Sequence, residues 1–301
     1  MLNGKKVTLV LGGGGMKGMA HIGVLKALHS FGIEPDEYVG TSVGSFICAL
    51  AAGGMSVDQI EAVGRSVGKQ DILDSNILNL VWKRGQARSL YRGKAFHDFV
   101  RRTLPVDRFE ELQKPLYMLA ANLSRGEEVI WGMPGLTEVP IHDCVVASCA
   151  LPGIFPPKKI HRYYFVDGSL VDTLPIKVAI YHNAGLIIGV YLESIDGGRF
   201  RDVPPVGIAD VLLQSQSLLS RTLFKHNLRH FQEAPLVLVQ PRVFGQGMFD
   251  FEEIPALIRE GERAAYEAFI GHPLLSEVKP PALTPPGIPA VPPPRPRAME
   301  A

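Results

Sequence analysis

The first fifty residues alternate apolar runs with glycine-rich turns, and this alternation constrains the fold more than any other feature of the chain. Residues 6–11 read Lys-Val-Thr-Leu-Val-Leu, apolar and β-branched on both faces, as expected of a central strand in a parallel sheet. The glycines Gly12–Gly15 follow, then apolar residues at helical spacing up to Leu28, and then a second apolar strand at Tyr38. Strand, loop, helix and strand within about thirty-five residues form a βαβ unit. We therefore predict a parallel sheet.

The second strand runs into Gly40-Thr41-Ser42-Val43-Gly44 and then into an apolar, helix-forming run that reaches Leu50. This is the spacing of a nucleophile elbow, in which a serine lies on a tight turn between strand and helix. The glycines on either side lack the Cβ atoms that would collide with strand or helix. Ser42 is therefore a candidate nucleophile, placed where the amides of a helix N-terminus favour developing negative charge.

The glycine loop after the first strand has three possible functions. A Walker-type phosphate loop fits worse than the other two, because Lys17 is followed by Gly18 and not by Ser or Thr, and because the spacing between the glycines is wrong. Gly13, Gly15 and Gly18 fit the GxGxxG pattern of dinucleotide-binding loops, and Asp36 or Glu37 lies near the offset of a ribose-binding acid. Alternatively, the amides of consecutive glycines can point to one place and form an oxyanion hole. A dinucleotide-binding fold has an acidic residue at the end of the next strand, whereas this chain has Gly-Thr-Ser-Val-Gly there. The difference favours the oxyanion hole.

An acid that is followed at once by a glycine comes much later in the chain, at the end of a predicted strand. A helix predicted from Pro140 to about Ala150 ends in the stiff loop Ser148–Pro157, and a strand predicted at residues 160–166 then delivers Asp167. A structural turn aspartate is the alternative. The aromatic, apolar strand before Asp167 favours partial burial, which raises a carboxyl pKa and makes a better base.

A catalytic triad would need a histidine after Asp167 in the chain. The histidines in that part of the chain are His182, His226, His230 and His272. None of them lies in a loop context that singles it out. His21, on the helix after the glycine loop, is interpreted in the same way, as a structural or surface residue.

Four blocks of this sequence resemble, in the same order, those of the patatin-like phospholipases, in particular compact bacterial members that consist of little more than the catalytic domain. The blocks are Gly13–Gly18, Gly40–Gly44, Ser148–Pro157 and Asp167-Gly168, within a region of roughly residues 5–191. The resemblance implies a three-layer α/β/α fold with a mainly parallel central sheet. It also implies serine acyl hydrolysis by a Ser-Asp dyad without histidine.

Residue by residue, the resemblance implies that Ser42 is the nucleophile and Asp167 the base that accepts its proton. It assigns the oxyanion hole to the amides of Gly13, Gly14 and Gly15. The supporting residues of the matched blocks are Lys17, Gly18, Gly40, Gly44 and Gly168. Ser169 departs from the family, since many members have Gly or Ala there, and we expect it to alter the mouth of the site.

Composition and charge narrow the range of partners. The net charge of +1 argues against a broad nucleic-acid surface, and no apolar run approaches the roughly twenty residues that span a bilayer. The cysteines, Cys48, Cys144 and Cys149, lie in apolar helical contexts without metal-ligand spacing, and we interpret them as buried thiols in a reducing compartment. We expect no nucleic-acid partner, metal or cofactor, and a cytoplasmic protein whose membrane contact, if any, is peripheral at the inner face.

The rest of the chain completes one domain. We predict a catalytic domain over residues 1–275 and a disordered, proline-rich tail over residues 279–301. Further helices are expected at 57–67, 175–182, 210–231 and 254–270, and further strands at 116–123, 128–131, 186–192 and 236–240.

Two segments combine apolar with basic residues. The first holds Lys83, Arg84, Arg88, Leu90, Tyr91, Arg92 and Lys94. It is either a solvated face or a cap that meets a lipid surface. The second is the predicted helix at 210–231, which is either a core helix or an interfacial one.

Taken together, these features predict a serine acyl hydrolase that acts through an acyl-enzyme, with phospholipids or lysophospholipids as the favoured substrates. A weaker form of the hypothesis keeps the dyad and replaces the lipid with another acyl ester or thioester. The alternative from a different class is a nucleotide-binding regulatory module that uses the GxGxxG loop without hydrolysis.

Overall fold

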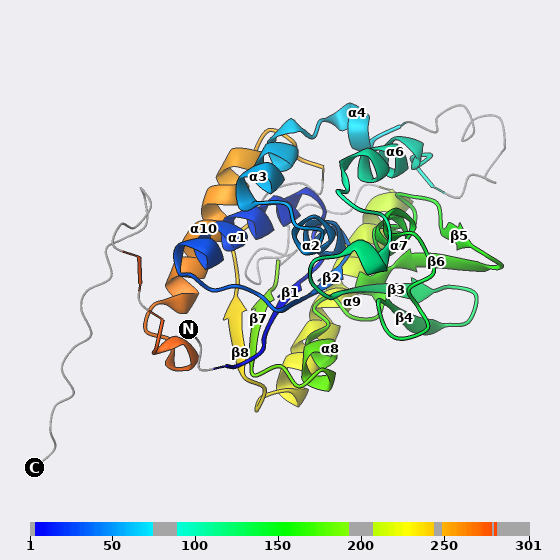
Figure 1. Cartoon of the computed structure of the whole chain (residues 1–301). Helices are drawn as coiled ribbons and strands as arrows, with labels where there is room; N and C mark the ends of the chain where they lie inside the picture. The colour runs from blue at the N-terminus through cyan, green and yellow to red at the C-terminus, as the bar shows by residue number, and fades with distance from the viewer. Residues whose placement is uncertain (1–3, 75–88, 193–206, 244–248, 279, 282–301) are drawn as a thin grey trace, which may run out of the picture.

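A mixed, mostly parallel sheet runs through the centre of the molecule (Figure 1). The computed structural model describes residues 4–74, 89–192, 207–243, 249–278 and 280–281. Its eight strands follow the order β5-β6-β3-β2-β1-β7-β8, with β4 beside β3. The parallel strands are β1 (Val7–Leu11), β2 (Glu37–Thr41), β3 (Leu116–Asn122), β7 (Leu186–Val190) and β8 (Leu236–Val239). The antiparallel strands are β4 (Glu127–Trp131), β5 (Lys158–Ile160) and β6 (Tyr163–Asp167).

Helices cover both faces of the sheet and complete the predicted three-layer α/β/α fold. Leu9 and Leu11 of β1 enter the larger core on one face, whereas Val10 enters a second core on the other face. This alternation follows from the two-residue period of a strand. The larger core takes side chains from α1 (Ala20–Ser30), α2 (Val43–Ala52), α3 (Val57–Ser66), α7 (Ile141–Ser148) and α10 (Ile254–Phe269). The second takes them from α8 (Ile176–Tyr181) and α9 (Ile208–His230).

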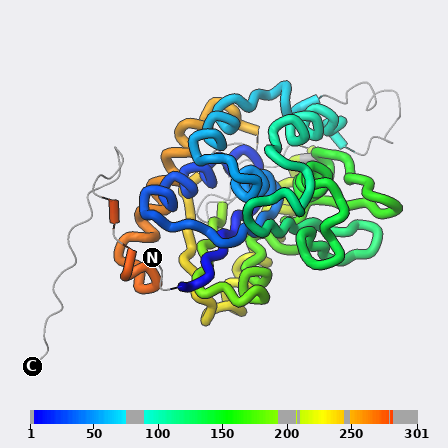
Figure 2. Tube along the Cα trace, in the orientation of Figure 1, coloured from blue at the N-terminus to red at the C-terminus, as the bar shows by residue number. Residues whose placement is uncertain are grey.

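The two ends of the domain pack together. Helix α10 lies along α1, and the blue and orange segments run side by side in both views (Figures 1 and 2). The ring of Phe31 meets those of Tyr266 and Phe269 edge to face, with centroids 4.9 and 5.4 Å apart. The predicted closing helix therefore belongs to the core built by the first helix.

The prediction of a single strand at residues 160–166 is wrong in one respect, because the structure has a hairpin of two strands there. Strand β5 ends at Ile160 and β6 begins at Tyr163, with His161 at a φ of 51° in the turn. Turns with positive φ are usually signalled by glycine or asparagine, and neither occurs here. The short helices α4 (Lys69–Ile72) and α6 (Lys94–Thr103) were also not predicted.

Strand β3 brings the ends of β2 and β6 together. Its residues 116–119 pair with β2, its residues 120–122 pair with β6, and β4 overlaps both stretches. Since a strand has only two hydrogen-bonding edges, β4 occupies one edge, and β2 and β6 share the other. They run towards each other, because β2 is parallel to β3 and β6 is antiparallel to it. Thr41 and Asp167, the last residues of the two strands, therefore meet.

Some sequence predictions fall outside this description. Most of the predicted tail at 279–301 and the basic residues Lys83, Arg84 and Arg88 lie outside the described residues. Within the described part of the chain, no helix combines the length and apolar character needed to cross a bilayer.

Candidate active site

The turn at Ser42 has the geometry of a nucleophile elbow. Strand β2 ends at Thr41, α2 begins at Val43, and Ser42 between them has φ 54° and ψ −130°. Such a conformation is strained for a residue with a side chain, and it is found where a serine must project from a tight turn. A Cβ at Gly44 would collide with the carbonyl oxygen of Leu11, and one at Gly40 with the backbone of Ser45. The predicted roles of both glycines are thus explained by close backbone packing.

Ser42 and Asp167 lie in direct contact, 125 residues apart in sequence. The Ser42 hydroxyl donates to Asp167 Oδ2 at 2.7 Å, and the amide of Ser169 donates to Asp167 Oδ1 at 2.8 Å. Ser42 is only 8% exposed and Asp167 only 2%. Burial raises the pKa of Asp167 to about 6, against the hydrogen bonds from Ser169 and Ser42, which lower it. Among the described residues no cation pairs with this carboxylate, so it keeps the basicity that burial gives it.

The glycine loop lies against Ser42. A Cβ at Gly13 would lie 3.1 Å from Ser42 Cβ and would collide with the hydroxyl of Ser169. The Gly13 amide donates to Thr173 O at 3.4 Å. In the part of the chain that the structure describes, the amides of Gly14 and Gly15 have no hydrogen-bond acceptor.

The remaining residues of the matched blocks support this arrangement. Lys17 and Gly18 lie buried in the short 3₁₀ helix η1 (Gly15–Met19), and a Cβ at Gly18 would collide with the side chain of Val43. Gly168 packs against the carbonyl oxygen of Leu119, where an added Cβ would collide. Ser169, the departure from the family, borders both the glycine loop and Asp167.

Ser148 is a residue of the site whose role the sequence did not reveal. Its hydroxyl lies in the gap between the carboxyl ends of β2 and β6 on the edge of β3. It donates to Leu119 O at 2.6 Å and accepts from the amide of Ser42 at 2.9 Å. The amide of the nucleophile is thus occupied by a structural hydrogen bond. A signal was present in the sequence, since Ser148 is a polar residue in the apolar last turn of the predicted helix.

The histidines do not complete a triad. Among the described residues, no histidine ring contacts Ser42 or Asp167. His21 is fully buried, and its Nε2 lies 2.8 Å from the carbonyl oxygen of Gly12, at the start of the glycine loop. Burial lowers the pKa of His21 to about 4, opposed by that hydrogen bond, so the ring is neutral and structural. The three cysteines are free and buried, as predicted.

A second polar cluster joins α6 to α7. The Nε2 atoms of His97 and His142 each lie 3.3 Å from Asp143 Oδ1, and His142 Nδ1 lies 2.7 Å from Asp107. These residue types are those of a metal site. The ammonium group of Lys158 already contacts the shared oxygen of Asp143, so an ion-pair network explains the cluster.

The two acids proposed for a dinucleotide site lie at the amino-terminal ends of the parallel strands, whereas the glycine loop lies at their carboxyl-terminal ends. Asp36 precedes β2 and accepts from the amide of Val7 at 2.7 Å. Glu37 begins β2, and its carboxylate contacts Lys6 Nζ at 2.7 Å and accepts from the Thr8 hydroxyl at 2.6 Å. Neither of these two acids therefore lies where it could bind a ribose at the glycine loop.

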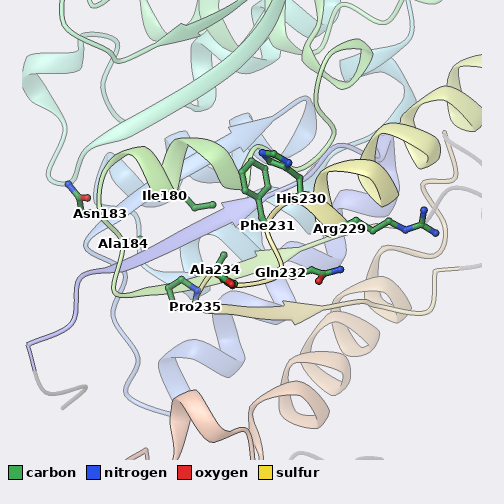
Figure 3. A pocket seen from close by; sticks show the side chains of 10 residues that line it. Ile180, Asn183, Ala184, Arg229, His230, Phe231, Gln232, Ala234 and Pro235 are labelled. Carbon is green, nitrogen blue, oxygen red and sulfur yellow. The ribbon is translucent and has the colours of Figure 1, made fainter.

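A surface hollow lies apart from the dyad (Figure 3). It is lined by Ile180, Asn183, Ala184, Arg229, His230, Phe231, Gln232, Glu233, Ala234 and Pro235. These residues lie at the C-terminal ends of α8 and α9 and in the segments that follow the two helices, just before the starts of β7 and β8. The hollow is therefore at the amino-terminal edge of the sheet, whereas Ser42 lies at the carboxyl-terminal edge.

Comparison with known proteins points to one family. The profile of the family described as patatin-like phospholipase matches residues 9–180. An uncharacterized NTE family protein of Mycobacterium tuberculosis is 27% identical over 290 residues, which cover 90% of this chain and 47% of that protein. Patatin-like phospholipase domain-containing protein 6 of Mus musculus is 30% identical over 198 residues, 65% of this chain and 14% of that protein. The chain spans about half the length of the mycobacterial relatives it matches.

Structural comparison agrees on the fold. The crystal structure of VipD from Legionella pneumophila matches with a TM-score of 0.54 at 14% sequence identity. The match covers 88% of this chain and 66% of the VipD chain.

Proposed function

Because the chain belongs to the patatin-like phospholipase family, we propose that it is a serine hydrolase of lipid acyl esters. The observation that carries this proposal is the 2.7 Å hydrogen bond from Ser42 to a buried Asp167 with a raised pKa. A carboxylate with a pKa near 6 is ionised at neutral pH and is a stronger base than a free aspartate. The catalytic domain is the unit over residues 1–275.

The reaction follows from the positions of these groups. Asp167 takes the proton of Ser42 as Oγ attacks the ester carbonyl carbon, and the carbonyl oxygen becomes an oxyanion. The amides of Gly14 and Gly15 bind that oxygen, joined by Gly13 if its weak bond to Thr173 opens. When the tetrahedral intermediate collapses, the C–O bond to the alcohol breaks and Asp167 returns the proton to the leaving oxygen.

The acyl-enzyme is then hydrolysed by the same groups. Water attacks the acyl carbon while Asp167 again accepts a proton, and collapse releases the fatty acid and restores the Ser42 hydroxyl. Neither step requires a metal or a cofactor in this scheme. We propose phospholipids or lysophospholipids as substrates, and a cytoplasmic protein that contacts the inner face of the membrane peripherally.

Labelling with a fluorophosphonate probe tests this function. We expect the probe to modify Ser42, as located by mass spectrometry of the labelled peptide, and we expect the modification to disappear in Asp167→Asn. The matched control is Ser42→Ala, which keeps the fold and removes the reactive oxygen. Folded wild-type protein that resists the probe would contradict the proposal, and binding of dinucleotides would then be measured by calorimetry.

A further inference from the structure

Helix α9 is apolar on two opposite sides. Its inner side packs on the sheet, where the ring of Phe224 stacks on Tyr191 at a centroid distance of 3.6 Å and Leu228 joins the same core. Its outer side carries four large apolar side chains that are 46–56% exposed, Val211, Leu212, Leu218 and Leu219, and Ser215 is exposed among them. We call these four residues the outer face of α9.

The spacing of these residues places them together. Val211 and Leu218 are seven residues apart, as are Leu212 and Leu219, and seven residues correspond to two helical turns. Surface helices of soluble proteins normally present polar residues on this side. An exposed apolar surface of this kind marks an interaction site.

The outer face lies at the rim of the candidate active site. One turn of α9 faces the site loops: the Gln216 side chain donates to Pro152 O at 3.4 Å, and the Ser220 hydroxyl donates to Ser169 O at 3.1 Å. Leu90 is a further exposed apolar residue, and it is bound to the residue that follows Pro152 in the same loop. It is 36% exposed, and its amide donates to Gly153 O at 2.9 Å.

The charges on α9 indicate which partner fits. Towards its C-terminal end, the exposed residues continue from Leu218 to Lys225 and Arg229 on the same side of the helix. No residue of α9 from 211 to 230 is acidic. An apolar face followed by basic residues is the pattern of a helix that lies in the interface of an anionic membrane.

We propose that the outer face of α9, together with Leu90, docks on an anionic lipid surface and holds the mouth of the active site against it. This inference rests on the proposed function, since a lipid substrate resides in such a surface. The nearly complete burial of Ser42 and Asp167 gives docking a purpose, because an acyl chain can then pass from the bilayer into the site without crossing water.

Vesicle binding tests this surface. The probes are phosphatidylcholine vesicles with and without phosphatidylglycerol, and the readout is cosedimentation of the full chain. We expect Leu218→Gln/Leu219→Gln to weaken binding at least about tenfold, because the variant lacks two leucines that the lipid buries on docking. We expect Lys225→Gln/Arg229→Gln to weaken binding only to vesicles that contain phosphatidylglycerol.

The chain offers a matched control. Leu136 is 41% exposed but follows β4 near the start of β3, at the opposite edge of the sheet from the dyad. Leu136→Gln should bind vesicles like the wild type. Circular dichroism of each variant verifies that the helix content is retained.

Several outcomes would overturn the inference. The first is wild-type protein that binds neither kind of vesicle, and the second is an outer-face variant that binds vesicles as well as the wild type. The third is a dimer that depends on Leu218 in sedimentation, which would make the outer face a contact between copies of the chain. Turnover is measured separately with a soluble short-chain ester, and the ratio of vesicle to soluble hydrolysis should fall at least about tenfold in the outer-face variant. Absence of soluble-ester hydrolysis in the wild type would instead contradict the proposed function, while the binding comparison would still be decided by cosedimentation.

Discussion

Asp167 and Glu37 are both buried carboxylates of the central sheet. Glu37 lies at the amino-terminal end of β2, whereas Asp167 lies beside its carboxyl-terminal end, and the two have different partners. Glu37, at the start of β2, contacts the ammonium group of Lys6, the Thr8 hydroxyl and, at 3.4 Å, His182 Nδ1. Asp167, at the end of β6, accepts hydrogen bonds from the Ser42 hydroxyl and from Ser169, and no cation pairs with it among the described residues. Burial alone therefore does not distinguish the two carboxylates, whereas their partners do.

The difference has an electrostatic reason. A cation compensates a buried carboxylate and holds it in place, as expected of a structural ion pair. Neutral donors compensate it only in part, so the charged form is destabilised and the pKa rises. The paired carboxylate stabilises the sheet, whereas the unpaired one takes up a proton readily. Four predictions follow from this contrast, in order of their expected effect on turnover.

Removing either member of the dyad should have the largest effect. We expect Ser42→Ala and Asp167→Asn each to lower kcat for a soluble ester by about ten-thousand-fold, because one loses the nucleophile and the other the base. Asp167→Asn should also raise the free energy of unfolding at pH 7, measured in urea, by about 1 to 3 kcal/mol, because it removes a poorly compensated buried charge. An active Ser42→Ala variant would exclude this nucleophile.

Ser148→Ala should lower kcat by about tenfold to a hundredfold, because the Ser42 amide and Leu119 O then lose the hydroxyl that aligns the elbow with Asp167. KM should change little, since Ser148 touches no substrate in this scheme. Ser148→Thr keeps the hydroxyl and should recover part of the rate. Equal losses in both variants would indicate that packing, and not the hydrogen bonds, is what matters.

Acidification should lower turnover through Asp167. Its pKa is raised to about 6, so kcat/KM should fall about tenfold for each pH unit below that value as the base is protonated. Acidification has the opposite effect on the stability of the fold, which it raises. A raised carboxyl pKa makes the fold lose stability as pH rises from about 4 to about 6, and urea titrations of the wild type and Asp167→Asn should differ in that window. A pH profile that is flat down to pH 5 would exclude Asp167 as the base.

Glu37→Gln should have the smallest effect on turnover, within about twofold, since Glu37 lies at the far edge of the sheet. Its cost should appear in the free energy of unfolding, lowered by about 1 to 3 kcal/mol. The lower part of that range is expected because Lys6 is 39% exposed and solvent screens it. A large loss of activity in a folded Glu37→Gln variant would remove the distinction between the two carboxylates.

The sequence was most informative where structure depends on neighbouring residues. Both strand-to-helix turns, the strands β3 and β4, and most later helices were predicted, because apolar period and turn residues are local properties. Even there, the turn between β5 and β6 was not predicted, because histidine does not signal the positive φ that His161 adopts. The outer face of α9 is a similar case. Its leucines are visible in the sequence, but only packing shows which of them face the core.

By itself, the sequence determined the elbow at Ser42 and a parallel α/β sheet, because glycine spacing and strand patterning act within a few residues. It supplied Asp167 as the partner only through resemblance to a family. The tertiary structure decided that Ser42 and Asp167 touch, because β2 and β6 run towards each other along one edge of β3, with Ser148 in the gap between them. Such pairing joins segments more than a hundred residues apart, and its free energy comes from burial and sheet hydrogen bonds formed only in the complete fold.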